Sequence, residues 1–174
     1  GGTLLVGDKI YFTTASTAGG AFSTLQVIDT STDTVTTLSD TFTTGGSNGG
    51  WNTPLYDASR EAIYSVALSG GILKWDINTS IESILPNSSD GSAGNFSDPV
   101  LFGDAIYYVK QGANVSTNGG SIWRYDLDSE ELIKLFDLHD YGAAAASQSG
   151  SLSVVWENGQ EVLYFLTSRS DGDN

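Results

Sequence analysis

The chain has 174 residues, 21 of them acidic and seven basic, which gives a formal net charge of −14 at pH 7. This charge argues against binding to nucleic acid or to an anionic membrane surface, because like charges repel. Cysteine is absent, which excludes disulfides, thiolate nucleophiles and cysteine-based metal sites. No apolar run approaches the roughly 18 residues of a transmembrane helix, so we expect no membrane span.

The first predicted element is a pair of short apolar runs around Gly7-Asp8, within Leu4–Phe12 (LLVGDKIYF). Two such runs around a tight, glycine-containing turn predict a β-hairpin. Similar paired runs recur along the chain, and in each the second run holds an apolar residue followed by tyrosine. They are Leu55–Val66, Val100–Val109 and Val154–Leu166, the last with a strong hairpin signal in Asn158-Gly159.

A second unit follows each of the first three hairpins. It consists of a glycine pair, a run rich in aromatic and β-branched residues, an aspartate, a polar turn and another apolar run. The copies are Gly19–Leu38, Gly70–Leu85 and Gly119–Leu138. The shared aspartates, Asp29, Asp76 and Asp126, lie 47 and 50 residues apart, and a period in this range indicates a repeat architecture. We expect these aspartates to be structural, with carboxylates that accept hydrogen bonds from turn amides.

The last run of the third copy, Glu130–Leu138, has apolar residues at helical spacing. Its equivalents in the other copies, Val35–Leu38 and Ile81–Leu85, do not share that spacing. We therefore predict a strand in all three copies.

Each full repeat thus contains four antiparallel strands, which is typical of a propeller blade. The predicted fold is all-β and β-propeller-like, with about three and a half repeats and 14 strands in a single repeat domain over residues 1–174. The expected blade units are about 1–40, 51–85 and 97–138, with a half blade at 151–168. Since closure takes at least about four blades, we expect a fragment of a longer propeller, or completion by a partner or by further copies. The unpaired Tyr164 strand is then an edge at which pairing can occur.

The Asp-centred unit resembles that of kelch-type propellers. The order Ile10–Thr14, Gly19-Gly20, Leu25–Asp29 and Val35–Leu38 is similar to the GloVer tandem repeats of secreted, surface-anchored proteins, and the later copies keep the glycine pair. This resemblance implies a propeller and a secreted or cell-surface location. It implies no particular reaction, because a fold does not fix a function.

Variable material gathers in the connections between the second and third strands of each repeat and in those between successive repeats, which a four-stranded meander brings to one face. The segments are Thr13–Gly20, Thr41–Pro54, Ala67–Gly71, Pro86–Pro99, Lys110–Gly120 and Asp137–Gly150. Loops on a rigid scaffold often carry binding sites, so this long-loop face is a candidate binding surface. The alternative is that these segments are solvated spacers.

Several residues are candidates for modification or ligand binding. Four N-glycosylation sequons fall in predicted turns or loops, at Asn78, Asn87, Asn95 and Asn114. Trp51, in a glycine-rich loop, is a candidate for stacking on a sugar. Asp171 and Asp173 alternate as calcium ligands do, although an aspartate that forms a turn is commoner than one that binds metal.

The sequence offers little for catalysis. His139 is the only histidine, and no Gly-x-Ser-x-Gly elbow is present. We therefore predict a non-enzymatic extracellular structural or interaction module that docks on protein partners, or on copies of itself, through open blade edges or the long-loop face. A glycan-binding or glycan-processing propeller is the alternative. A calcium-stabilised adhesion domain is a third hypothesis.

Overall fold

The computed structural model describes residues 3–15, 22–43, 53–66, 71–89, 95–96, 99–111, 120–138 and 152–165. The described residues form 15 β-strands. The chain divides into two compact units, Gly1–Ser92 and Ala93–Asn174. Each unit is built from antiparallel sheets, and with one exception the strands of each sheet follow the chain order.

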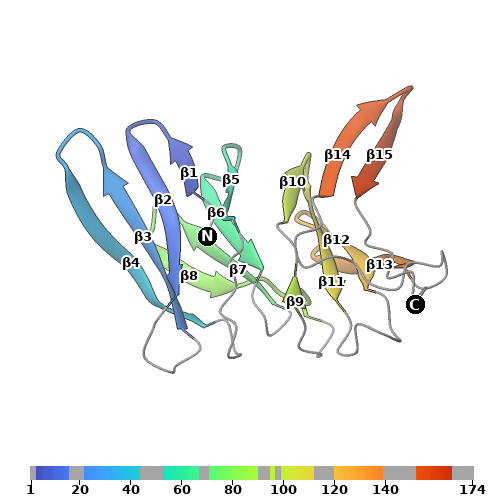
Figure 1. Cartoon of the computed structure of the whole chain (residues 1–174), viewed down its shortest axis with the longest axis horizontal. Helices are drawn as coiled ribbons and strands as arrows, with labels where there is room; N and C mark the ends of the chain where they lie inside the picture. The colour runs from blue at the N-terminus through green and yellow to red at the C-terminus, as the bar shows by residue number, and fades with distance from the viewer. Residues whose placement is uncertain are drawn as a thin grey trace, which may run out of the picture. The chain divides into compact units, whose positions relative to one another are not determined.

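The first sheet contains the four strands β1 to β4 in order (Figure 1). They are β1 (Thr3–Val6), β2 (Lys9–Ala15), β3 (Phe22–Asp29) and β4 (Thr34–Thr43). Gly7 makes the first turn with φ at +57°, a conformation that glycine adopts without steric cost. The predicted loop over residues 13–20 was too long, because β2 continues to Ala15 and pairs there with Ser23.

The second sheet completes the first unit. Its strands are β5 (Leu55–Asp57), β6 (Ala62–Val66), β7 (Ile72–Asp76) and β8 (Ile81–Ile84). All five residues of β6 are buried. Because successive side chains of a strand point to opposite faces, β6 is buried on both of them, as its continuous apolar sequence suggests.

The second unit opens with a sheet of the same design. Its strands are β10 (Val100–Phe102), β11 (Ala105–Gln111), β12 (Ser121–Asp126) and β13 (Glu131–Asp137). The strand predicted in place of a helix over 130–138 is confirmed by β13, which pairs with β12 over its length.

One strand was not predicted. β9 (Asn95–Phe96) pairs with Lys110 and Gln111 at the end of β11, where β10 no longer reaches. The backbone groups of these two β11 residues need partners, and β9 supplies them. A strand of two residues has no periodicity by which a sequence could reveal it.

The chain's last described sheet has two strands, β14 (Leu152–Glu157) and β15 (Gln160–Phe165). Asn158 and Gly159 join them with φ angles of 51° and 79°. Two positive φ angles are typical of the type I′ turn that an Asn-Gly pair predicts. Three four-stranded antiparallel sheets and a two-stranded one, with β9 apart, confirm the predicted fold class.

Candidate interaction surfaces

The two sheets of the first unit pack face to face. One apolar cluster combines buried residues of both sheets, namely Tyr11, Leu25 and Val27 from the first and Ile63, Leu73 and Trp75 from the second. We call the face of a sheet that packs on the next sheet in the chain its forward face, and the face that packs on the preceding sheet its backward face. The forward face of β1–β4 therefore contacts the backward face of β5–β8.

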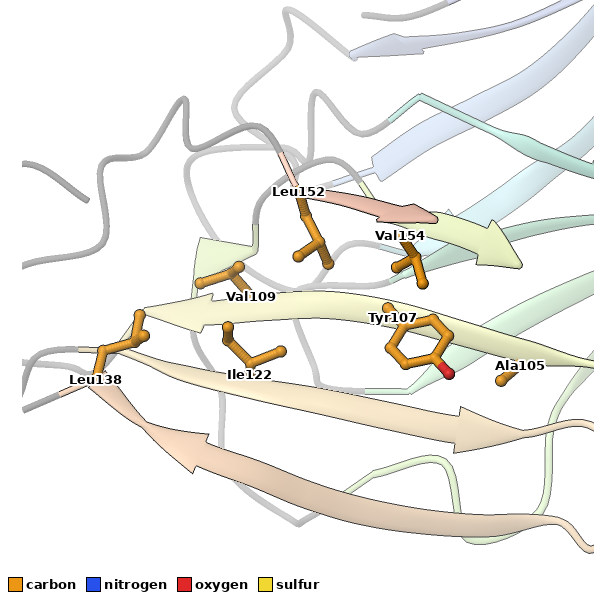
Figure 2. Packing of buried hydrophobic residues seen from close by; sticks show 7 residues of the cluster. All are labelled: Ala105, Tyr107, Val109, Ile122, Leu138, Leu152 and Val154. Carbon is orange, nitrogen blue, oxygen red and sulfur yellow. The ribbon is translucent and has the colours of Figure 1, made fainter. Parts of the chain in front are cut away.

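The second unit repeats this arrangement between β10–β13 and the β14–β15 hairpin (Figure 2). The forward face of the four-stranded sheet contributes Ala105, Tyr107, Val109, Ile122 and Leu138. Leu152 and Val154 of β14 cover them, and the partly buried Leu163 of β15 adds to the contact. The hairpin thus occupies the place of a following blade and presents its backward face to the sheet.

A polar network joins the hairpin to the sheet. The hydroxyl of the fully buried Tyr107 donates a hydrogen bond to the carboxylate of Glu161 and accepts one of 3.1 Å from Arg124 Nε. Arg124 Nη2 lies 2.8 Å from Asp126 Oδ2, and the guanidinium lies 5.9 Å from the centroid of the Tyr107 ring. Burial, with a smaller effect of Glu161, raises the pKa of Tyr107 above its usual value, so the tyrosine remains a neutral donor.

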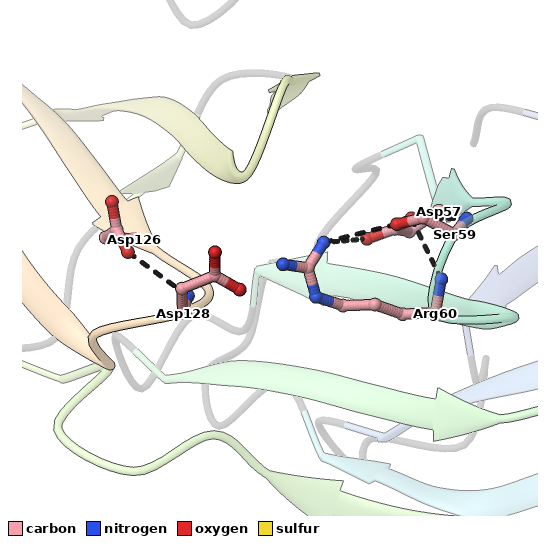
Figure 3. A network of polar contacts seen from close by, with 5 residues as sticks. All are labelled: Asp57, Ser59, Arg60, Asp126 and Asp128. Atoms are coloured by element: carbon pink, nitrogen blue, oxygen red, sulfur yellow. Dashed lines mark hydrogen bonds and ion pairs between the residues drawn. The ribbon is translucent and has the colours of Figure 1, made fainter.

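The three recurring aspartates lie in turns of one design, each between the third and fourth strands of a sheet. In each, Oδ1 accepts a hydrogen bond from the backbone amide two residues ahead, at 3.0 Å for Asp29 and at 3.1 Å for both Asp76 and Asp126. Figure 3 shows this contact for Asp126. Four residues after the aspartate, each turn ends in a residue of positive φ, namely Asp33, Ser80 or Glu130. The carboxylate thus stabilises a turn whose last residue has an unfavourable backbone conformation.

A fourth turn of this design, at Asp57, is one that the sequence analysis did not single out. The Asp57 carboxylate accepts hydrogen bonds from the Ser59 amide at 2.9 Å and from the Ser59 hydroxyl at 2.6 Å, and it pairs with Arg60 at 2.8 Å (Figure 3). Glu61, four residues on, has a φ of 46°. The spacing from Asp57 to Glu61 equals that from Asp29 to Asp33, and this is the signal that could have identified it.

The turn at Asp126 gives a prediction about pH. The backbone amide of Ser129 is the main cause that lowers the pKa of Asp126 to about 2, and the Ser129 hydroxyl and Arg124 contribute less. A lowered pKa in the folded state means that the charged carboxylate stabilises the fold at pH values above the usual carboxyl range. That contribution is lost as the pH falls from about 4 to about 2. We expect Asp126→Asn to unfold at lower urea concentration than the wild type at pH 7, with a difference that shrinks toward pH 2.

Urea titrations of both proteins at a series of pH values measure this difference. Ser129→Ala is the matched control, because it removes the hydroxyl donor and keeps the amide, so its effect should be smaller. A wild-type advantage that stays constant from pH 7 to pH 2 would contradict the assignment.

Two apolar surfaces of the described residues are open. The first is the backward face of β1–β4, where one cross-strand row runs through all four strands as Leu5, Ile10, Ile28 and Val35. Leu5 is 68% exposed and Val35 62%, and the two isoleucines between them are partly exposed. The corresponding row of the second sheet, Tyr56, Ile63, Trp75 and Glu82, includes three residues of the cluster that packs on the first sheet.

The second open surface is the β14–β15 hairpin. In the described part of the chain, β14 is the only strand that pairs with β15. The forward face of the hairpin carries the cross-strand pair Val155 and Val162, both partly exposed, and Tyr164, which is 52% exposed. Tyr164 donates a hydrogen bond of 2.9 Å to Glu157, which holds its ring over this face.

The predicted modification and ligand sites lie on other elements or outside the described residues. Asn78 and Asn87 are exposed in turns, and the backbone of Asn95 lies in β9. Asn114, Trp51, His139, Asp171 and Asp173 fall outside the described residues, as does most of the long-loop face. Glycosylation, sugar stacking and calcium binding therefore stay predictions.

Two further kinds of feature are absent from the described residues. Three or more histidine, cysteine, aspartate or glutamate side chains do not come together there in a way that could hold a metal ion. The described part of the chain also contains no helix with the length and apolar character needed to cross a membrane.

Some solved structures have an architecture similar to that of this chain. The chain superposes on the AtxE2 isopeptidase in its apo form with a TM-score of 0.52, at 10% identity, over 95% of this chain and 25% of the isopeptidase. The matched part is a propeller domain. The chain has a β-propeller-like fold. The S527A variant of this isopeptidase with Astexin3-dC4 bound gives a TM-score of 0.52 at 11% identity, over the same shares of both chains.

The tricorn protease is also similar, at 15% identity and a TM-score of 0.44, over 73% of this chain and 12% of that one. No protein family and no curated protein matches the chain by sequence. The chain spans about a quarter of the isopeptidase, so the likeness concerns the fold and not the activity of that enzyme.

Proposed function

We propose that this chain is a non-enzymatic structural and interaction module that docks on protein partners through its open sheet edge and faces, in a secreted or cell-surface setting. The observation that carries the proposal is the two-stranded β14–β15 sheet. It occupies the place of a blade, packs its backward face on β10–β13, and leaves β15 without a second neighbour among the described strands.

The free edge of β15 has the chemistry of a docking site. In a two-residue hairpin the flanking residues exchange both backbone hydrogen bonds, and bonded and non-bonded pairs alternate from there. The amides of Glu161, Leu163 and Phe165 therefore point away from β14, by the observed register. A partner strand that pairs with this edge would gain main-chain hydrogen bonds, as in β-strand addition.

The extracellular setting and the non-enzymatic role are inferred from the sequence alone. The resemblance to tandem repeats of secreted proteins supports an extracellular location. Asp57 and Asp126 stabilise turns, and Arg124 and Glu161 join the hairpin to its sheet through Tyr107, which supports a scaffold that keeps its shape while its edges bind.

A peptide with the sequence of Gly120–Leu127 (GSIWRYDL) tests the edge. This segment contains β12, which pairs with β11 in the sheet that precedes the hairpin. We expect it to pair with β15 in the same way, and so to slow hydrogen exchange at the amides of Glu161, Leu163 and Phe165.

The matched control is the same peptide with proline in place of Trp123 and Tyr125, whose amides face β11 in the sheet, so that two of the backbone donors needed for the pairing are removed. Equal exchange rates at these three amides with and without the unmodified peptide would count against edge docking.

A further inference from the structure

The two open faces are of the two kinds that pack on each other within this chain. In both units a forward face packs on a backward face, in the first through Tyr11 and Val27 and in the second through Tyr107 and Val109. The two exposed apolar faces described above are one of each kind. They are the backward face of β1–β4 and the forward face of the β14–β15 hairpin.

The backward face of β1–β4 includes one row with the composition of a buried face. Its row of Leu5, Ile10, Ile28 and Val35 is aliphatic on every strand. In the second sheet the corresponding row ends in the charged residue Glu82. Three of the four residues in that row still pack against the first sheet. A row of four aliphatic side chains with both ends more than half exposed is the kind of surface that marks an interface.

The forward face of the hairpin is smaller and matches it in character. Val155 and Val162 form its centre. They are the next cross-strand pair on the same face after Glu157 and Gln160, which flank the turn. Val100 and Tyr107 hold the same place in the preceding sheet, and both take part in the apolar cluster of the second unit. Tyr164 extends this surface toward the open end of the hairpin.

We propose that the forward face of the β14–β15 hairpin binds the backward face of β1–β4 in a second copy of this chain. The occupant is a second copy because this chain twice packs surfaces of these two kinds against each other. The inference rests on the proposed function and names its partner. The contact is head-to-tail: each copy uses one surface to bind and offers the other, so association continues into a ring or an open chain of copies.

The charge of the chain makes the association depend on salt. Copies that each carry a net charge of −14 repel one another at low ionic strength. Salt screens this repulsion and strengthens apolar contact, so self-association should increase with added sodium chloride.

Sedimentation velocity over roughly a hundredfold range of protein concentration tests the proposal. We expect the wild type to shift from monomer to larger species as concentration rises. Val35→Glu blocks the backward face and Tyr164→Glu blocks the hairpin, and each variant alone should remain monomeric. Both positions are more than half exposed, so the substitutions should leave the fold intact, which far-ultraviolet circular dichroism checks.

The decisive sample is an equal mixture of the two variants. Each retains the surface that the other lacks, so the mixture should contain a dimer of one copy of each and nothing larger. Ile81→Glu is the matched control, since Ile81 is 61% exposed in β8 and lies on neither open face. It should associate like the wild type.

Three results would overturn the inference. They are a wild type that stays monomeric at all concentrations and salt levels, a mixture that forms no dimer, and equal loss of association in the Ile81→Glu control. If the peptide still protects β15 in a protein that stays monomeric, the docking function stands and only the choice of partner is wrong. If neither is seen, the docking function fails as well.

Discussion

Replacing Tyr107 with alanine should lower the free energy of unfolding by about 3–5 kcal/mol, which is the usual cost of truncating a large buried aromatic side chain. Tyr107 is fully buried, and its ring lies in the cluster that holds the hairpin on β10–β13. The substitution leaves a cavity there and removes the hydroxyl that joins Arg124 to Glu161. Urea unfolding followed by near-ultraviolet circular dichroism measures the loss.

Tyr107→Phe separates the two causes. It keeps the ring and removes only the hydroxyl, so we expect a loss of about 1 kcal/mol, as for an ordinary hydrogen bond. Its partners are the partly buried Arg124 and the exposed Glu161, and their access to water limits the penalty for leaving them unpaired. A phenylalanine variant as unstable as the alanine variant would show that the polar network, and not the packing of the ring, holds the hairpin.

The fold could be predicted because its signals are local. Alternating apolar runs specify strands, and turn residues such as Gly7 and the Asn158-Gly159 pair require backbone conformations that few other residues adopt. The recurring aspartates mark turns for the same reason, because each carboxylate bonds to an amide only two residues away. Local patterns repeated with a regular period are sufficient to indicate blades.

The features that the sequence did not reveal depend on contacts between distant segments. Tyr107 and Glu161 are 54 residues apart, and no periodicity connects them. β9 exists because the end of β11 needs a partner, which is a property of the folded sheet. The turn at Asp57 was missed for a different reason, since its aspartate lies between the first two strands and not between the last two.

Of the two open surfaces, the sequence predicted one and not the other. The sequence predicted an exposed edge at the Tyr164 strand, from the count of strands in the last unit. It did not predict the open face of β1–β4, because β1 alternates Leu4 with Leu5 and both residues look suited to a core. Only the packing of the second sheet shows that Leu4 belongs to the covered face and Leu5 to the open one.

In the first unit, Leu25→Ala should lower the free energy of unfolding by about 2–5 kcal/mol. Leu25 is fully buried in the cluster between the two sheets, where alanine would leave a cavity. Val35→Ala is the matched control in the neighbouring strand of the same sheet, and its effect should stay within about 0.5 kcal/mol because the side chain is exposed. Urea unfolding at low protein concentration measures both without a contribution from association.

The control position also links stability to docking. Val35→Ala is expected to leave unfolding unchanged, whereas Val35→Glu is expected to abolish self-association. A side chain that matters for binding and not for folding belongs to an interface. If Val35→Ala cost as much stability as Leu25→Ala, the backward face of β1–β4 would already be covered within the single chain, and a second copy would have no surface to occupy there.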